Sequence, residues 1–201
     1  MIPAKFTIAV GGSRKAKQWK NKEFSWSDIL DKLRVTTRTR ESAADYANLS
    51  KPRQDEIKDV GGFVGGYIKN GRRIAGNVVK RQLVTLDADF ADSSFMTILD
   101  LVLGDVCYAV YSTHKHTPEK PRLRVVIPLA RAVQPDAYQA IARRIADDIG
   151  MDLFDDTTYE AERLMYWPST STDGEYIFFA NDRENCLDPV SYTHLRAHET
   201  R

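Results

Sequence analysis

The stretch that decides the fold of this chain is Leu83-Val84-Thr85-Leu86-Asp87-Ala88-Asp89-Phe90. Its apolar run predicts a buried β-strand that ends in an Asp-x-Asp pair. Successive side chains of a strand point to opposite faces, so Asp87 and Asp89 fall on one face, two residues apart. Carboxylates this close repel each other unless a divalent cation bridges them. The pair therefore predicts a metal site, and replacing either aspartate is expected to keep or raise stability.

Two further groups of polar residues follow along the chain. A second strand-like run ends in Tyr111-Ser112-Thr113-His114-Lys115-His116, and an acidic pair, Asp155-Asp156, comes later. We expect His114 and His116 to project from the same face of that strand. An acidic pair, a histidine-bearing strand and a further aspartate, in this order, suggest phosphoryl chemistry on nucleotides with two metal ions.

The residues from Ser191 to Arg201 break the preceding pattern and are interpreted as translated sequencing-adapter DNA. We expect them, like a fusion scar, to belong to neither the fold nor the site. On this interpretation the natural protein continues past Val190, and residues 1–190 are its N-terminal piece. That piece is long enough for one domain with its own core.

Composition limits the class of protein. The longest apolar stretches are too short to span a bilayer, and the N-terminus lacks a signal-peptide core. Cys107 and Cys186 lie far apart and show no metal-ligand spacing, which favours a reduced cytosolic setting. We therefore expect a cytoplasmic protein with no membrane partner.

Charge is divided unevenly along the chain. Residues 1–81 hold 18 Lys and Arg against 8 Asp and Glu, a net charge of +10. Residues 82–190 hold 9 against 19, a net charge of −10. The asymmetry indicates either two salt-bridged surfaces or a basic, phosphate-binding part beside a motif-bearing carboxylate part that handles nucleic acid.

The apolar periodicity predicts alternating strands and helices. Ser25 and Asp28 form a capping-box-like helix start, and Pro135 lies near the start of another helix. Mixed elements of this length predict an α+β sheet with packed helices. The predicted strands cover residues 5–10, 82–88, 107–112, 123–129, 164–167 and 176–179, the last two flanking a turn. The predicted helices cover residues 25–33, 41–49, 52–58, 94–103 and 135–149.

A glycine-dense segment, Gly61–Gly66, precedes the Asp-x-Asp strand. It is either a backbone cradle for a phosphate or a flexible bend, and it matches neither a Walker A loop nor GxGxxG. Arg72, Arg73 and Lys80 lie just beyond it, and we expect them to reach nucleotide or template phosphates.

The histidines allow three interpretations. The segment His114-Lys115-His116 could be the metal pair of a rolling-circle nuclease, with Tyr138 as its nucleophile, although Lys115 stands where that motif has an apolar residue. A histidine could instead donate to a triphosphate, together with Arg122 and Arg124, which alternate on one face of the next strand. The histidines could also be plain surface residues.

Three stretches resemble the motifs of the archaeo-eukaryotic primase superfamily. They look most like the primase-polymerase domain at the N-terminus of virulence-associated E type replication proteins of phages and mobile elements, and the resemblance covers nearly all of residues 1–190. It implies a catalytic sheet of the RNA-recognition-motif type with packed helices and an N-terminal α/β unit. The stretches are residues 86–89 (Leu-Asp-Ala-Asp), residues 111–129 from Tyr-Ser-Thr-His-Lys-His to Val-Ile-Pro-Leu, and residues 154–169 from Phe-Asp-Asp to Trp-Pro-Ser.

The resemblance assigns metal-binding carboxylates. The family's first motif falls on Asp87 and Asp89, and its third, a hydrophobic residue then Asp, fits Phe154-Asp155, with Asp156 as the rival. These carboxylates would hold two Mg²⁺ or Mn²⁺ ions, which activate a 3′-hydroxyl and stabilise the leaving pyrophosphate.

The resemblance also assigns phosphate contacts. The family's second motif, Ser/Thr-x-His, fits Ser112-Thr113-His114 or His114-Lys115-His116. The register ending at His116 is preferred, since Thr-Pro-Glu-x-Pro-Arg usually follows the functional histidine. Arg122, Arg124 and Arg163 would neutralise phosphates, or Arg163 would form a structural ion pair.

The implied activity is template-directed nucleotidyl transfer by a DNA primase or polymerase that replicates a phage or mobile element in a bacterial host. Its partners would be single-stranded DNA, nucleoside triphosphates and a C-terminal helicase-like ATPase. The competing hypothesis is a non-catalytic nucleic-acid-binding module of a replication helicase, which leaves the three acidic positions without a purpose.

Overall fold

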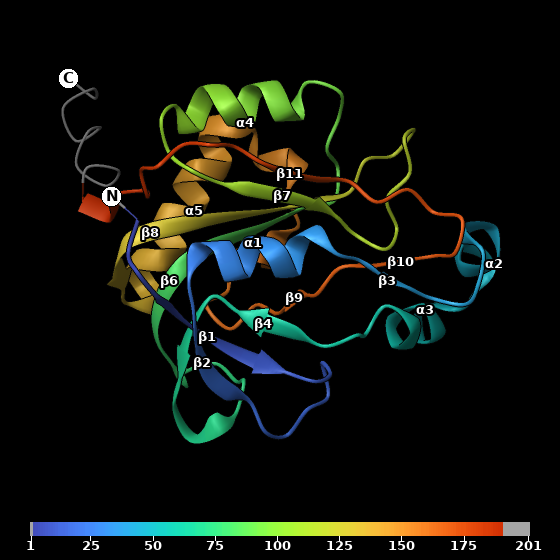
Figure 1. Ribbon diagram of the computed structural model, residues 1–201, viewed down its shortest axis with the longest axis horizontal. Helices are drawn as coiled ribbons and strands as arrows, with labels where there is room; N and C mark the ends of the chain where they lie inside the picture. Colours follow the sequence, from blue (N-terminus) through green and yellow to red (C-terminus); the bar gives the residue numbers. More distant parts are fainter. Residues whose placement is uncertain (1, 191–201) are drawn as a thin grey trace.

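The computed structural model describes residues 2–190, so the adapter-like tail lies outside the described residues. At its centre is an antiparallel sheet of five strands in the order β11-β7-β8-β6-β5 (Figure 1). The two long strands, β6 and β8, pair so that Asp87 lies opposite Arg124. The strands of this sheet are β5 (Gly66–Ile68), β6 (Val78–Ala88), β7 (Ala109–Ser112), β8 (Leu123–Val133) and β11 (Phe178–Ala180).

The two faces of the central sheet are covered by different layers. Helices α4 (Phe95–Leu103) and α5 (Pro135–Ile149) cover one face, where Val84 and Leu86 of β6 join their apolar side chains. Helix α1 (Trp26–Arg34) lies on the other face (Figure 1) and packs near Leu83. Alternation along β6 thus sends Asp87 toward the α1 side, with Leu83 and Thr85.

A smaller N-terminal unit lies beside α1. Its four-stranded sheet has the order β2-β1-β4-β9, and a parallel strand pair, β3-β10, lies near two short helices. These elements are β1 (Phe6–Gly11), β2 (Lys20–Phe24), β3 (Thr37–Arg38), α2 (Ala43–Asn48), α3 (Lys51–Ile57), β4 (Gly62–Val64), β9 (Met165–Tyr166) and β10 (Ser169–Thr170). Short 3₁₀ turns cover Lys69–Gly71, Met151–Leu153 and Asp156–Tyr159.

The predicted α+β class, with a helix-covered sheet and an N-terminal α/β unit, is confirmed. The capping box at α1 forms as expected, because the Ser25 hydroxyl accepts from the Asp28 N–H and the Asp28 carboxylate accepts from the Ser25 N–H. Helix α5 has the predicted bounds, Pro135–Ile149. These elements carry their own start signals, which is why local pattern was enough to find them.

Several strands differ from their prediction. Strand β7 ends at Ser112, so His114 and His116 lie in a turn and not on a strand. The segments 164–167 and 176–179 form short strands in different sheets: β9 pairs with β4, and β11 pairs with β7. These pairings join segments far apart in sequence, which a local pattern does not contain.

The glycine-dense segment forms two strands of different sheets, β4 and β5, so it is not a phosphate-cradling loop, and the bend between elements is confined to Gly65. A Cβ at Gly62 would lie 2.4 Å from the Met165 carbonyl oxygen, and one at Gly66 would lie 2.0 Å from that of Lys80. Glycine is therefore required here because neighbouring strands approach too closely for any side chain.

The two oppositely charged parts of the chain are interleaved. Strand β5, from the basic part, joins the central sheet, while β9, from the acidic part, joins the N-terminal sheet. The basic and acidic parts of the sequence therefore fold together and do not form separate structural units. Among the helices of residues 2–190, none combines the length and apolar character that a membrane crossing requires.

Candidate active site

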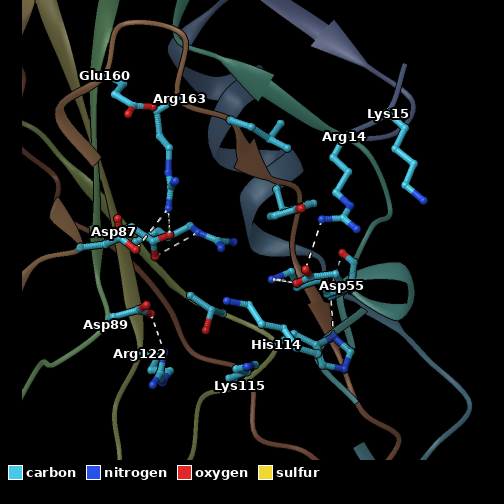
Figure 2. A pocket seen from close by; sticks show the side chains of 18 of the residues that line it. Arg14, Lys15, Asp55, Asp87, Asp89, His114, Lys115, Arg122, Glu160 and Arg163 are labelled. Carbon is cyan, nitrogen blue, oxygen red and sulfur yellow. Dashed lines mark hydrogen bonds and ion pairs between the residues drawn. The ribbon is translucent and has the colours of Figure 1, made fainter. Parts of the chain in front are cut away.

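A cavity of about 780 Å³ opens where the end of β6 faces the N-terminal unit (Figure 2). It is rich in charge, with nine Lys and Arg side chains and five Asp and Glu side chains in its wall. The basic residues are Arg14, Lys15, Lys51, Lys58, Arg73, Lys115, Arg122, Arg124 and Arg163; the acidic ones are Asp55, Asp87, Asp89, Asp155 and Glu160.

Three of the predicted carboxylates line this wall. Asp87 ends β6 and Asp89 follows it, and a hydrogen bond from the Asp155 N–H to the Asp87 carbonyl (3.0 Å) brings Asp155 alongside. The Thr158 hydroxyl oxygen accepts from the Asp87 N–H at 2.7 Å and fixes the same junction. Asp156 begins the following 3₁₀ turn and does not line the cavity.

Arginines supply the counter-charge for these carboxylates. Arg122 lies 2.9 Å from Asp89, and Arg124 lies 3.4 Å from Asp87 on the paired strand. Arg163 reaches both Asp87 (3.6 Å) and Asp155 (3.5 Å). The carboxylate repulsion, which the sequence indicated only a divalent cation would relieve, is therefore relieved by three arginines from elsewhere in the chain.

The ionisation of two of these groups follows from their surroundings. Burial works to raise the pKa of Asp155, but hydrogen bonds from Thr157 and the charge of Arg163 outweigh it and leave the pKa lowered. Burial works to lower the pKa of Arg124, yet the charges of Asp87 and Asp89 and the interaction with Tyr111 together outweigh it and leave the pKa raised. Asp155 and Arg124 are therefore charged at neutral pH.

The donor set suits a hard divalent cation, which prefers carboxylate oxygens. The Oδ1 atom of Asp87 is buried and accepts no hydrogen bond, and its partner there is the Arg124 guanidinium, whose Nε lies 3.4 Å away. Within residues 2–190, however, no group of three or more His, Cys, Asp or Glu is already gathered as a metal site. The Arg163 guanidinium contacts both Asp87 and Asp155 and supplies the positive charge between them.

His114 lines the cavity across from Asp87 and Asp89 (Figure 2). Its ring packs on Tyr46 at 4.2 Å, with Nδ1 2.9 Å from the Ser169 hydroxyl and Nε2 3.1 Å from a Glu41 carboxylate oxygen. Burial lowers the pKa of His114 despite Glu41, so the ring is neutral at pH 7, with Nε2 donating to Glu41.

His116 and Ser112, by contrast, lie outside the cavity. The His116 Nδ1 accepts from the Arg122 N–H at 3.3 Å, and its Nε2 lies 3.4 Å from Glu175. The Ser112 hydroxyl accepts from the Ile177 N–H at 2.9 Å. Both residues hold neighbouring loops, and of the two histidines only His114 shares the cavity with the carboxylates.

The remaining predicted basic residues divide in the same way. Arg73 lines the cavity and lies over the Trp19 ring, 5.4 Å from its centre, whereas Arg72 and Lys80 lie outside. Sequence reasoning missed Arg14, Lys15, Lys51, Lys58 and Asp55 as site residues. The only signal for the four basic ones was the positive charge of residues 1–81, which does not single out positions.

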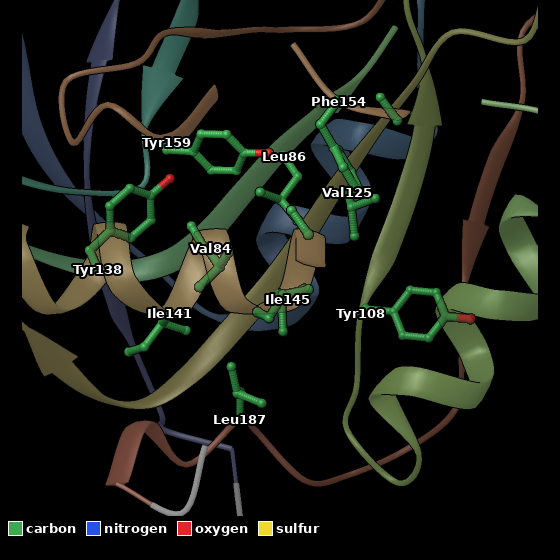
Figure 3. Close-up of a cluster of buried hydrophobic side chains, with 14 of the residues drawn as sticks. Val84, Leu86, Tyr108, Val125, Tyr138, Ile141, Ile145, Phe154, Tyr159 and Leu187 are labelled. Atoms are coloured by element: carbon green, nitrogen blue, oxygen red, sulfur yellow. The ribbon is translucent and has the colours of Figure 1, made fainter. Parts of the chain in front are cut away.

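Tyr138, the candidate nuclease tyrosine, is fully buried between α5 and the central sheet (Figure 3). Its hydroxyl donates to the Thr85 carbonyl at 3.3 Å, and its ring lies 3.9 Å from the Arg81 guanidinium. A tyrosine so enclosed has no access to a DNA phosphate in this structure. Tyr166, by contrast, lines the cavity.

Comparison with known proteins agrees with this architecture. The chain resembles the AEP domain of the primase-polymerase (PrimPol) of cyanophage S-2L, with a TM-score of 0.50 and 13% identity over 94% of this chain and 88% of that one. At this identity the likeness shows the fold alone. No curated protein matches the chain. The family described as the VapE N-terminal domain matches residues 2–195. The sequence-based resemblance is thereby confirmed, and the chain belongs to the VapE N-terminal domain family.

Proposed function

We propose that this domain is a divalent-metal-dependent nucleotidyltransferase, a DNA primase or polymerase that acts on a template. One observation carries the proposal: Asp87, Asp89 and Asp155 converge on a cavity whose wall also holds His114 and nine basic side chains. A polyanionic substrate together with cations would satisfy both sets of charges.

The three carboxylates would hold the metal. When bound, Mg²⁺ or Mn²⁺ would lower the pKa of a 3′-hydroxyl and neutralise the departing pyrophosphate. Arg163 contacts the same carboxylates, so it must give them up and is then free to bind phosphate oxygens in a bidentate manner. Asp155 is preferred over Asp156 as the third carboxylate because only Asp155 lines the cavity.

The basic wall would hold the triphosphate. Burial and the neighbouring charges of Lys58 and Arg122 lower the pKa of Lys115, which indicates a surplus of positive charge that an anion would relieve. Arg122, Arg124 and Arg73 face the same space. Arg72 and Lys80, outside the cavity, remain candidates for contacts with the template backbone.

Between the two histidine registers, position favours Ser112-Thr113-His114. The Nε2–H of His114 faces a carboxylate oxygen of Glu41, so a phosphate oxygen would have to take that oxygen's place. A neutral donor at this position contributes a hydrogen bond without adding charge.

The decisive experiment is template-dependent incorporation, with and without a primer, using ribo- and deoxyribonucleotides in Mg²⁺ and in Mn²⁺. Asp155→Asn and Asp156→Asn are matched variants, because the two residues are neighbours and only the first lines the cavity. We expect Asp155→Asn to abolish incorporation and Asp156→Asn to retain it. Absence of incorporation by the wild-type chain under every condition would overturn the proposal.

A second candidate function is a non-catalytic nucleic-acid-binding module. The observation in its favour is that Arg163 already neutralises Asp87 and Asp155. Titration with Mn²⁺ separates the two, since such a module would be indifferent to the metal. In a polymerase, Arg163→Gln should tighten Mn²⁺ binding by removing a competing cation.

We further propose that the domain works in replication of a phage or mobile element, in the cytoplasm of the host cell, together with a C-terminal helicase-like ATPase. The VapE N-terminal family and the primase-polymerase fold support this setting. Co-purification of the full-length protein with DNA-dependent ATPase activity would test the partner.

A further inference from the structure

A second hollow, the lysine groove, lies on the N-terminal sheet beside α1. It has a volume of about 350 Å³, and its principal side chains are Val10, Lys20, Lys22, Phe24, Lys32 and Trp167. Alternation along β2 builds one wall, because Lys20, Lys22 and Phe24 share a face. The intervening Asn21 and Glu23 are engaged elsewhere, with Ile68 and Lys5 respectively.

The positive charge of the lysine groove is not balanced by acidic side chains in its lining. Among the described residues that line it, three are lysines and none is acidic. Lys20 and Lys22 are exposed strand residues, and Lys32 extends from the last turn of α1. Three positive charges gathered around one hollow attract a polyanion rather than a peptide of mixed charge.

Two aromatic rings give the lysine groove a surface for stacking. Trp167 packs on Phe63 with ring centres 4.6 Å apart, which fixes the indole while leaving it partly exposed. The Lys32 ammonium lies 5.1 Å from the Trp167 ring and 5.8 Å from the Phe24 ring. Lysines beside partly exposed aromatic rings are the combination that holds single-stranded nucleic acid, through phosphates and stacked bases.

The lysine groove adjoins the candidate active site. Tyr166 lines the cavity and Trp167 lines the groove; Gly12 lines the groove and Arg14 the cavity. The two segments are joined where the Trp167 N–H donates to the Gly61 carbonyl at 3.0 Å, and Gly61 in turn lies against Gly11 and Gly12. The two hollows are therefore neighbours that lie on either side of the segments carrying Gly61 and Trp167.

We propose that the lysine groove binds the single-stranded DNA template just outside the cavity, with a base on Trp167 and the backbone along Lys20, Lys22 and Lys32. The inference rests on the proposed function in one respect, since it takes the bound strand to be the template. Binding itself requires neither metal nor nucleotide, so it can be measured separately.

The test is the affinity of the whole chain for a fluorescent single-stranded DNA of about 12 nucleotides, the range of such sites, without metal or nucleotide. Lys20→Gln/Lys22→Gln should weaken binding about tenfold and lower the slope of log affinity against log salt by about 1.4, from two lost phosphate contacts. Trp167→Ala should weaken binding about tenfold through lost stacking, and Trp167→Phe should retain most of the affinity.

The matched control is Lys5→Gln/Arg131→Gln, which removes the same charge from two exposed residues outside both hollows. It should leave affinity within about twofold, as expected for charges that do not contact the strand. Equal weakening by both double variants would overturn the proposal, because affinity would then follow total charge. If Trp167→Ala unfolds the protein because Phe63 loses its packing partner, the Lys20→Gln/Lys22→Gln variant decides the test.

The outcomes also separate this inference from the proposed function. If the groove variants bind DNA normally and the wild-type protein is active, the groove proposal is overturned and the polymerase proposal stands. If the groove variants lose affinity for DNA but the wild-type chain incorporates no nucleotide, the groove proposal is upheld and the polymerase proposal is refuted.

Discussion

The two faces of strand β6 are built from alternate residues and are stabilised by different interactions. On one face, Val84 and Leu86 lie in an apolar layer with α4 and α5, where side chains such as Ile145 are close neighbours (Figure 3). On the other face, Leu83 joins the apolar layer with α1, whereas Thr85 and Asp87 are buried but polar. The apolar side chains are held by the exclusion of water, and the polar ones by specific hydrogen-bond and charge partners.

Arg81 shows how the polar side of the structure is held. It is fully buried and donates to the Ala161 carbonyl (2.6 Å), the Leu83 carbonyl (3.0 Å) and the Thr85 hydroxyl (2.9 Å). Losing a group on the apolar face leaves a cavity, whereas losing one on the polar face leaves a partner without its hydrogen bond or counter-charge. Substitutions at neighbouring residues of one strand should therefore destabilise the protein for different reasons.

The largest expected effect is that of Asp87→Asn. Incorporation should fall by roughly hundredfold or more, since a metal ligand is weakened. Stability should also fall, by about 3 kcal/mol, because Arg124 loses its buried counter-charge. The carboxylate repulsion inferred from sequence predicts the opposite sign. Urea unfolding decides between them, with Asp89→Asn, whose partner Arg122 is more exposed, as the control that should change stability little.

Leu86→Ala, one residue away, should show the converse. It should cost about 2–5 kcal/mol of unfolding free energy through the cavity it leaves among Val84, Val125 and Ile145. Where the variant remains folded, kcat and the nucleotide KM should stay near wild type. A loss of activity in folded Leu86→Ala protein would mean that the two faces are not separable.

The histidine pair gives a smaller and sharper difference. His114→Ala should raise the nucleotide KM about tenfold and lower kcat, since one donor to the triphosphate is lost. His116→Ala should be milder, because His116 contacts Glu175 and the Arg122 backbone outside the cavity. Steady-state kinetics with each of the four nucleotides should show the same ratio. A more severe His116→Ala variant would restore the register preferred from sequence.

The smallest effect concerns pH. Burial lowers the pKa of both His114 and His116, so between the folded and the unfolded pKa the unfolded chain binds more protons. The free energy of unfolding should therefore fall as pH drops below about 6.5, the ordinary histidine pKa. Glu41 and Asp155, whose pKa values are also lowered, add a further loss only below their ordinary values of 4.5 and 3.8.

Unfolding curves at about pH 7.5 and about pH 5.5 span the histidine range. His114→Gln/His116→Gln should flatten the dependence between them. Stability that is constant or increasing toward the lower pH in wild-type protein would contradict the burial of neutral histidines.

Much of this protein was determined by its sequence alone. The capping residues of α1, the apolar spacing of α5 and the Asp-x-Asp strand are local signals, since each depends on residues within a few positions of one another. The family motifs also lie in short stretches, and the family assignment is confirmed. The site residues read from those motifs remain predictions.

Only the tertiary structure decided which of those residues share a cavity. It places His114 and Asp155 in the cavity and leaves His116 and Asp156 outside, although each pair differs by only one or two positions in sequence. It brings Arg14, Lys51 and Lys58 to carboxylates that lie far along the chain. It joins β9 to β4 across about a hundred residues, and with that pairing Tyr166 and Trp167 face different hollows. The physical reason is that these contacts depend on strand pairing and layer packing between distant segments, and no local period in the sequence records them.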